Sequence, residues 1–201
     1  MRSVLGPVGT PSTKHQRRGA ALDARRLEAG LRRDPATDGP ALLRALAPLL
    51  VGVHTVASYI SIGSEPSTEV IHAALLAAGV QVLAPVLQPD GDLGWAVHTG
   101  ALVPAGRGLQ QPAGPDLGRD ALAAAQIVLV PALAVDRRGV RLGRGGGSYD
   151  RALPRARALT IALLHDGELV DALPSEPHDI RVDAAATPSG GVIRLPDGMD
   201  R

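Results

Sequence analysis

Residues 136–150 read DRRGVRLGRGGGSYD, and the rest of the chain is organised around this stretch. It holds five glycines and four arginines, with an aspartate at each end. Glycine lets backbone N–H groups approach a ligand closely, and arginine offers a forked set of donors that suits phosphate. The stretch therefore predicts an anion-binding loop, most readily for a polyphosphate. A flexible hairpin loop with solvated arginines is the alternative that these residues leave open.

Two aspartates are candidate metal ligands. Asp150 closes the stretch and lies at the start of a helix-like segment that extends to residue 157. Mg²⁺ prefers carboxylate oxygens and often shares its shell with phosphates, so an aspartate beside a phosphate loop suits this ion. The alternative is an acid that merely stabilises a helix N-terminus. Asp183, in HDIRVD at 178–183, is the second candidate, with a plain surface acid as its alternative.

Several common catalytic motifs are absent from the sequence. No Gly-Lys-Ser/Thr follows the glycines, their spacing does not give GxGxxG, and there is no GxSxG. The six histidines include no pair with the spacing of a metal site on a helix. These observations argue against a Walker loop, a Rossmann fingerprint and a serine hydrolase.

The composition restricts the class of protein. The 201 residues carry a net charge of +1, which argues against a dedicated nucleic-acid binder. The chain has no cysteine, which excludes disulfides and fits a reducing compartment. No apolar run reaches the roughly 20 residues that span a bilayer, and the first residues lack the apolar core of a signal peptide. We therefore expect a soluble cytoplasmic protein, monomeric by default, without nucleic-acid or membrane partners.

The single lysine is a further candidate. The chain has 20 arginines and only Lys14. A sequence that replaces lysine so widely can retain one where a compact ammonium is needed. Lys14 and Arg18 are four residues apart and share a helix face. Chance on a solvated helix face is the alternative.

Strands that alternate with helices predict an α/β layered fold with a largely parallel sheet. The run TVASYISI (55–62), the helix after Ser67 and the strand 80–86 form a βαβ unit with parallel strands. One domain is expected over 14–195, with flexible tails at 1–13 and 196–201 and a long loop at 99–118. Further helices are predicted at 14–33, 40–50 and 120–125, and further strands at 93–98, 127–130, 159–164, 168–173 and 184–187.

The segment PALAVDRRGVRLGRGGGSYDR, 131–151, closely resembles the signature of the 5-formyltetrahydrofolate cyclo-ligase family, roughly PGLAFDxxGxRLGxGGGYYDR. Other segments that resemble the family follow in the expected order: KHQRR (14–18), SYISIGSEPST (58–68), GLQQP (108–112) and EPHDIRVDAAAT (176–187). The resemblance covers about residues 14–193. It implies a three-layer α/β sandwich like that of the NagB/RpiA/CoA transferase-like proteins.

The resemblance also implies a reaction. The family closes the ring of 5-formyltetrahydrofolate to give 5,10-methenyltetrahydrofolate, with ATP converted to ADP and phosphate. Such chemistry needs positioned phosphates and neutralised charge rather than a protein nucleophile. The partners would be ATP with Mg²⁺ and a reduced folate. Two alternatives remain: a relative with another substrate, and a weakly catalytic paralogue that binds folate or nucleotide.

The family's motifs imply a role for each matching residue. Arg144 would be catalytic, and Asp150 and Asp183 would hold Mg²⁺. The residues implied to bind ATP are Lys14, Arg18, Arg141, Leu142, Gly143, Arg144, Gly145, Gly146, Gly147, Ser148 and Tyr149. Those implied to contact the folate are Ile60, Glu65, Trp95, Arg144 and Tyr149, with ordinary core packing as the alternative for Trp95.

The loop departs from the family pattern at one position. The family usually has two tyrosines before the aspartate, and the first of them is Ser148 here. A small hydroxyl replaces a ring that could pack on the substrate. The glycines and Asp150 are unaffected by this change.

Overall fold

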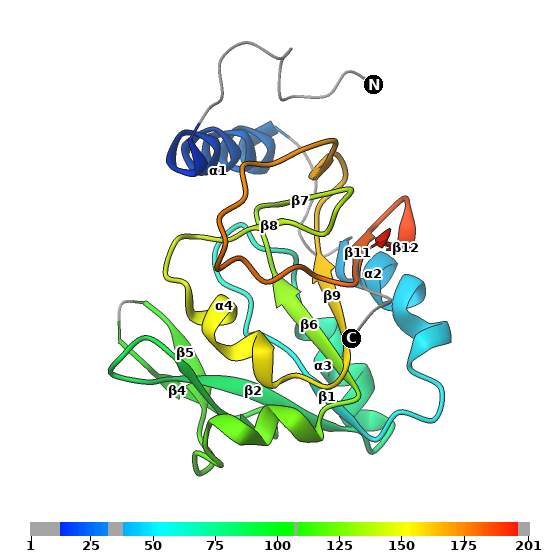
Figure 1. The fold of residues 1–201 in the computed structure, drawn as a ribbon. Coiled ribbons are helices and arrows are strands. Elements are labelled where there is room, and N and C mark those ends of the chain that lie inside the picture. Colours follow the sequence, from blue (N-terminus) through cyan, green and yellow to red (C-terminus); the bar gives the residue numbers. More distant parts are fainter. Residues whose placement is uncertain (1–12, 32–37, 107, 197–201) are drawn as a thin grey trace.

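The structure, a computed structural model, describes residues 13–31, 38–106 and 108–196. Its centre is a seven-stranded sheet with the order β12-β11-β9-β6-β1-β2-β3 (Figure 1). The five inner strands are mutually parallel, and the two edge strands, β3 and β12, are antiparallel to their neighbours. The strands of this sheet are β1 (Thr55–Ala57), β2 (Gln81–Leu87), β3 (Leu93–Val97), β6 (Ile127–Pro131), β9 (Leu159–Leu163), β11 (Ala184–Thr187) and β12 (Gly191–Arg194). The predicted α/β fold with a largely parallel sheet is confirmed.

Both faces of the sheet are covered, which explains why its inner strands are almost wholly apolar. On β6, Ile127 and Leu129 pack on one face, while Val128 and Val130 pack on the other, as the two-residue period of a strand requires. The first face is covered by α2 (Asp38–Leu46) and α3 (Glu69–Ala77). The second is covered by the short helices η3 (Arg119–Ala124), α4 (Ser148–Ala152) and η4 (Leu153–Arg155).

The strand order creates a switch point beside β1. From β1 the chain adds β2 and β3 on one side, and it later adds β6, β9 and β11 on the other. The segments that follow β1 and β6 therefore leave the sheet in different directions. In open parallel sheets, ligands bind at such a point, beyond the carboxyl ends of the strands.

A second, three-stranded sheet carries α1 (Lys14–Leu31). It consists of β10 (Leu169–Val170), β7 (Ala134–Asp136) and β8 (Arg141–Leu142). Leu22 of α1 packs against its apolar cluster, and α1 lies next to β7 and β8 (Figure 1). Arg25 fixes this arrangement, because it donates at 2.6 Å both to the Glu168 carboxylate and to the carbonyl of Ala132.

Several predicted boundaries differ from the structure. The strand predicted at 55–62 ends at Ala57, where the chain turns away to form part of a cavity wall. The long loop at 99–118 contains a hairpin, β4 (Leu102–Pro104) with β5 (Gln110–Pro112). The helix predicted after the glycines is one α-helical turn followed by a 3₁₀ turn that contains Pro154, because proline interrupts helical hydrogen bonding.

Other differences concern the second half of the chain and its ends. The strand β12 was not predicted, and the strand predicted at 168–173 is only two residues long. The helix predicted at 40–50 begins at Asp38 and ends at Leu46, followed by the 3₁₀ turn η2 (Ala47–Leu49). The predicted tails at 1–13 and 196–201 lie almost wholly outside the described residues. Within the described parts, no helix is long and apolar enough to cross a membrane.

A buried histidine pair predicts acid sensitivity of the fold. His72 of α3 contacts the Ser58 hydroxyl at 2.8 Å and the His98 ring at 5.0 Å between centroids. Burial, with a smaller contribution from His98, lowers the pKa of His72 to about 4. Between pH 6.5 and about 4 the unfolded chain binds a proton at this residue that the folded chain does not, so stability falls as the pH falls. At about 1.4 kcal/mol per pKa unit, the loss is on the order of 3 kcal/mol.

We expect the His72→Gln variant to lose much of this pH dependence. Urea unfolding at several pH values between 4 and 7 measures it, as the slope of unfolding free energy against pH. Ser58→Ala is the matched control, since it removes the hydroxyl partner but keeps the titrating ring. An unchanged slope in His72→Gln would show that other groups cause the acid sensitivity.

Candidate active site

A cavity of about 330 Å³ lies at the switch point of the sheet. Its walls come from the segments that follow β1 and β6, from the end of β2, from the hairpin β4–β5, from the start of α1 and from residues 176–179. The glycine-rich loop at 143–147 forms one side. The cavity thus occupies the position that the topology favours for a ligand.

The glycine loop needs its glycines for backbone geometry. Gly145 and Gly147 have φ values of 104° and 67°, in a region that other residues rarely adopt. Gly147 precedes the single turn of α4, and a Cβ there would lie 2.9 Å from an Arg151 nitrogen. The turn that follows places Ser148, Tyr149 and Asp150 along the cavity wall.

Two cations of α1 reach the cavity from outside the main sheet. Arg18 donates through Nε to the carbonyl of Gly143 at 2.9 Å, which links α1 to the glycine loop. Lys14 is 9% exposed and is paired with Asp179 and, at 3.4 Å, with Glu176. Burial alone would raise the pKa of Asp179, but hydrogen bonds from Lys14 and from the Glu176 backbone lower it below its usual value.

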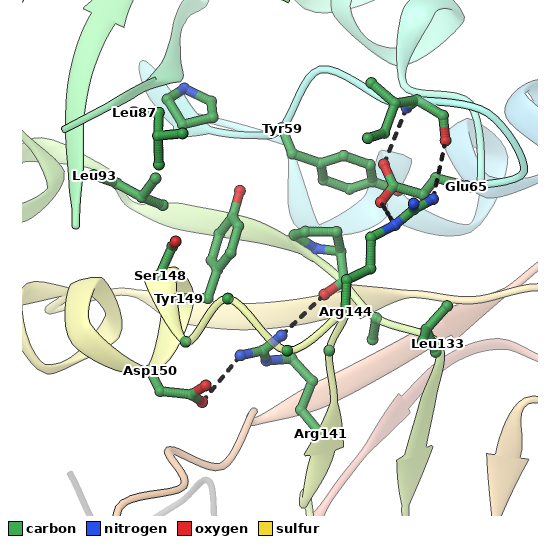
Figure 2. A pocket seen from close by; sticks show the side chains of 18 of the residues that line it. Tyr59, Glu65, Leu87, Leu93, Leu133, Arg141, Arg144, Ser148, Tyr149 and Asp150 are labelled. Atoms are coloured by element: carbon green, nitrogen blue, oxygen red, sulfur yellow. Dashed lines mark hydrogen bonds and ion pairs between the residues drawn. The ribbon is translucent and has the colours of Figure 1, made fainter. Parts of the chain in front are cut away.

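Arg144 is held across the cavity by Glu65. Its Nε lies 2.9 Å from Glu65 Oε1, while Oε2 of the same carboxylate accepts from the Ile62 amide at 3.0 Å. The Arg144 side chain is 43% exposed, whereas that of Glu65 is 8% exposed. Figure 2 shows the arginine extending from the glycine loop towards the segment after β1. The partly exposed guanidinium of Arg144 is therefore paired with a largely buried carboxylate.

Arg141 contacts two other residues of the cavity wall, Asp150 and Tyr149. Its Nη2 lies 3.0 Å from Asp150 Oδ1, and its Nη1 donates to the carbonyl of Pro131 at 3.3 Å. Its guanidinium carbon lies 5.6 Å from the centre of the Tyr149 ring, within range of a cation–π contact. Asp150 and Tyr149 are thus both oriented by one buried arginine.

The cavity also has apolar walls. Pro85 and Leu87 of β2, Leu93 of β3, Leu133 and the rings of Tyr59 and Tyr149 are among the residues that line it. The cations Lys14, Arg18 and Arg144 lie on walls built by α1 and the glycine loop. One cavity therefore combines a surface that suits phosphates with a space that suits a flat ring.

Thirteen of the predicted site residues line this cavity: Lys14, Arg18, Ile60, Glu65, Arg141, Gly143, Arg144, Gly145, Gly146, Gly147, Ser148, Tyr149 and Asp150.

Three predicted site residues lie elsewhere. Trp95 is 0% exposed in the core beneath η3, which is the ordinary core packing given above as the alternative to a folate contact. Leu142 packs in the apolar cluster of the small sheet. Asp183 is buried, and its Oδ2 accepts from both the amide and the hydroxyl of Thr160 at 2.7 Å. The structure thus gives these three side chains packing contacts or internal hydrogen bonds in place of the expected ligand contacts.

The sequence interpretation missed an acidic group on the cavity wall. Glu176, His178 and Asp179 all line the cavity, and their potential ligand atoms lie within 4.8 Å of one another. They precede Asp183 in the same segment. The run EPHD at 176–179 is the signal for this group in the sequence, whereas the family motif points to Asp183, the last aspartate of the segment. Among the described residues, the cavity carboxylates are Glu65, Asp150, Glu176 and Asp179.

The first aspartate of the signature has a structural task. Asp136 is fully buried, and its carboxylate accepts from the backbone amides of Arg138, Val140 and Leu173. The Arg138 guanidinium adds contacts at 3.0 and 2.7 Å. Asp136 therefore shapes the turn between β7 and β8, which delivers Arg141 and the glycine loop to the cavity.

The sequence of this chain is similar to those of known proteins. The sequence model of the 5-formyltetrahydrofolate cyclo-ligase family matches residues 12–188. A 5-formyltetrahydrofolate cyclo-ligase of Mycolicibacterium smegmatis is 40% identical over 194 residues, which is 92% of this chain and 99% of the relative. One from Escherichia coli K12 is 34% identical over 149 residues, which is 71% of this chain and 82% of the relative.

Two solved structures share the fold of this chain. The NMR structure of Aquifex aeolicus 5,10-methenyltetrahydrofolate synthetase superimposes with a TM-score of 0.76 at 25% identity, and covers 94% of this chain and 95% of its own. A 5,10-methenyltetrahydrofolate synthetase from Mycoplasma pneumoniae, 17% identical, shares the fold with a TM-score of 0.67 over 87% of this chain and 98% of its own. Several residues of the signature at 131–151 line the cavity. This chain belongs to the 5-formyltetrahydrofolate cyclo-ligase family.

Proposed function

We propose that this protein catalyses the ATP-dependent conversion of 5-formyltetrahydrofolate to 5,10-methenyltetrahydrofolate, with release of ADP and phosphate. The observation that carries the proposal is the mixed lining of one cavity. Its cationic side chains suit the phosphates of ATP, and its apolar side chains suit the bicyclic ring of a reduced folate. Family membership supports the same reaction.

In this reaction the formyl oxygen attacks the γ-phosphorus of ATP, and ADP leaves. The nitrogen N10 then attacks the activated formyl carbon, and phosphate departs with the former formyl oxygen as N10 loses its proton. Phosphoryl transfer depends on positioning and on charge neutralisation. Lys14, Arg18 and the amides of the glycine loop would orient the phosphates. Arg144 would exchange Glu65 for the transferring phosphoryl group.

The cavity also fits the Mg²⁺ that accompanies ATP. A hard cation takes carboxylate oxygens and keeps several waters. Asp150 and Asp179 line the cavity, whereas Asp183 is not among its lining residues and accepts two hydrogen bonds from Thr160 at Oδ2. Asp179 accepts from Lys14 and from the Glu176 amide, and the ion would replace the contact with Lys14. We therefore assign Mg²⁺ binding to Asp150 and Asp179, with Glu176 nearby, in place of the pair Asp150 and Asp183. The ion would neutralise phosphate charge, and Lys14, now paired with Asp179, would turn to the phosphates.

The test is a direct assay of the purified protein. With Mg-ATP and 5-formyltetrahydrofolate, we expect a methenyl product visible by its near-ultraviolet absorbance and one ADP per product. Omission of ATP should abolish the signal. Folate binding without any product would contradict the enzyme assignment and favour a binding paralogue. Turnover of ATP only with another formyl compound would favour a relative with a different substrate.

We further propose a cytoplasmic protein without nucleic-acid partners, because the chain lacks cysteine and its net charge is +1. A monomer is the default assignment for its oligomeric state. Gel filtration at several protein concentrations tests the oligomeric state.

A further inference from the structure

One arginine behind the cavity connects two of the segments that build it. Arg151 lies in α4, directly after the glycine loop, and is not among the residues that line the cavity. Its Nη2 donates at 2.7 Å to the carbonyl of Gly146 and at 2.7 Å to the carbonyl of Gly91, in the turn between β2 and β3. Leu87 and Leu93, which are paired on either side of this turn, line the cavity. One nitrogen atom therefore joins the glycine loop to the hairpin β2–β3.

The guanidinium of Arg151 lies against the backbone on both sides. A Cβ built on Gly91 would lie 2.8 Å from Nη2, and one built on Gly147 would lie 2.9 Å from Nη1. A side chain at either position would push the guanidinium away. The two glycines thus form a slot that accepts a flat group with donors at its edge.

The turn between β2 and β3 is also held by two other arginines. Arg119 Nη2 lies 2.7 Å from Asp90 Oδ2, and its Nη1 lies 3.3 Å from Asp92 Oδ2. Arg155 Nη2 donates to Asp92 Oδ1 at 2.7 Å. Burial alone would raise the pKa of Asp92, but hydrogen bonds from Arg155 and from the Leu93 amide lower it below its usual value. The turn therefore stays fixed to η3 and η4 without any contribution from Arg151.

The glycine loop has other attachments only near its beginning. Arg18 donates to the carbonyl of Gly143 at 2.9 Å, and Arg144 is paired with Glu65 at 2.9 Å. Near its end, the carbonyl of Gly146 is held by the bond from α4. Loss of this bond would thus be felt in the loop and not in the turn.

The bond to Gly146 also sets the direction of the next amide. A trans peptide is planar, and its carbonyl and N–H point in opposite directions. Gly146 and Gly147 line the cavity, whereas Arg151 does not. A carbonyl that points to Arg151 therefore directs the Gly147 N–H towards the cavity.

We propose that Arg151 is a positioning residue for the nucleotide. It holds the Gly146 carbonyl on the outer side of the loop, so that the loop presents its amides to the phosphates. The inference rests on the proposed function, since it takes Mg-ATP as the ligand of the glycine loop. It deepens that function by assigning the shape of the loop to a residue that touches neither substrate.

The test compares Arg151→Met with the unaltered protein. Methionine keeps an unbranched apolar stem and removes every donor, and the position is exposed, so the variant should fold. Calorimetry measures the dissociation constants of Mg-ATP and, separately, of 5-formyltetrahydrofolate. We expect the affinity for Mg-ATP to fall about five- to tenfold and the affinity for the folate to change by less than about twofold, because only the glycine loop loses hydrogen bonds.

Ionic strength separates positioning from charge. Arg151→Met also removes a positive charge near the phosphates, and an effect of that charge would be screened by salt. The ratio of the two Mg-ATP dissociation constants, variant to unaltered protein, should therefore stay the same between about 0.05 M and about 0.5 M salt. A ratio that falls to one at high salt would show that Arg151 acts through its charge alone, and would overturn the positioning role.

Arg119→Met is the matched control. It removes an arginine that also makes two contacts at the turn, but that does not reach the glycine loop. It should lower the melting temperature and leave both dissociation constants unchanged. An equal loss of Mg-ATP affinity in both variants would assign the effect to general loosening and would contradict the role of Arg151.

The outcomes also separate the two levels of inference. If Arg151→Met binds Mg-ATP normally while the unaltered protein forms the methenyl product, the role of Arg151 is wrong and the proposed function stands. If Arg151→Met shows the selective loss of Mg-ATP affinity but the unaltered protein forms no product, the proposed function is wrong and the positioning role stands. An unaltered protein that does not bind Mg-ATP overturns both.

Discussion

Replacement of Arg144 by alanine is expected to lower kcat by about 10²- to 10³-fold, the range for loss of one donor to developing transition-state charge. The guanidinium is the exposed end of an ion pair that crosses the cavity, so it can move to a phosphoryl group without unfolding its surroundings. Glu65 is 8% exposed, so loss of Arg144 leaves a largely buried carboxylate without its cation, and we expect a lower melting temperature as well. Turnover is therefore measured well below the melting transition of the variant, where the loss of kcat reports on the chemistry. Steady-state kinetics with varied ATP and folate measure the effect.

Arg137→Ala provides a control from the same signature. Arg137 is 68% exposed and contacts only the exposed Asp171 among the ion pairs of the described residues. It should retain the kcat of the unaltered protein. Arg144→Lys keeps the charge but loses the fork, and we expect it to recover part of the activity. A kcat of Arg144→Ala within threefold of the unaltered protein would exclude the proposed catalytic role.

Local sequence patterns predicted the parts of the fold that depend on local forces. The parallel strands were recognisable because both of their faces are buried, which requires an unbroken apolar run. The glycine loop was recognisable because positive φ values and close backbone approach favour glycine. The single lysine proved to line the cavity, on the same helix face as Arg18.

Features that depend on distant contacts were not predictable in the same way. The family resemblance implied that Trp95 contacts the folate, but packing against η3, which follows β3 by more than 20 residues, places its side chain in the core. β12 forms because it pairs with β11 at the edge of the sheet, and its four residues are too few for a clear alternation of apolar and polar side chains. The partners of Glu65 and Lys14 lie 79 and 165 residues away, and only the assembled structure shows these pairs.

The segment 176–183 shows the difference most clearly. Its aspartates, Asp179 and Asp183, are four residues apart, and both fit a short family motif. The structure separates them. Asp179 lines the cavity beside Lys14, while Asp183 turns inward and accepts two hydrogen bonds from Thr160. Two substitutions of the same chemistry should therefore have different effects, and the second main prediction follows from this contrast.

Asp179→Asn is expected to raise the Mg²⁺ concentration for half-maximal activity at least tenfold, because an amide is a much weaker ligand for a hard cation. Asp183→Asn is expected to leave that concentration unchanged and to lower the unfolding free energy by about 1–3 kcal/mol, because the neutral amide oxygen accepts the two Thr160 hydrogen bonds more weakly than a carboxylate does. Asp150→Asn, which either assignment places at the metal, is the positive control. Activity against free Mg²⁺ at fixed ATP, and urea unfolding of each variant, provide the two measurements. A raised Mg²⁺ requirement in Asp183→Asn together with a normal one in Asp179→Asn would return the ligand role to Asp183. It would also require the Thr160 hydrogen bonds to open whenever the metal binds.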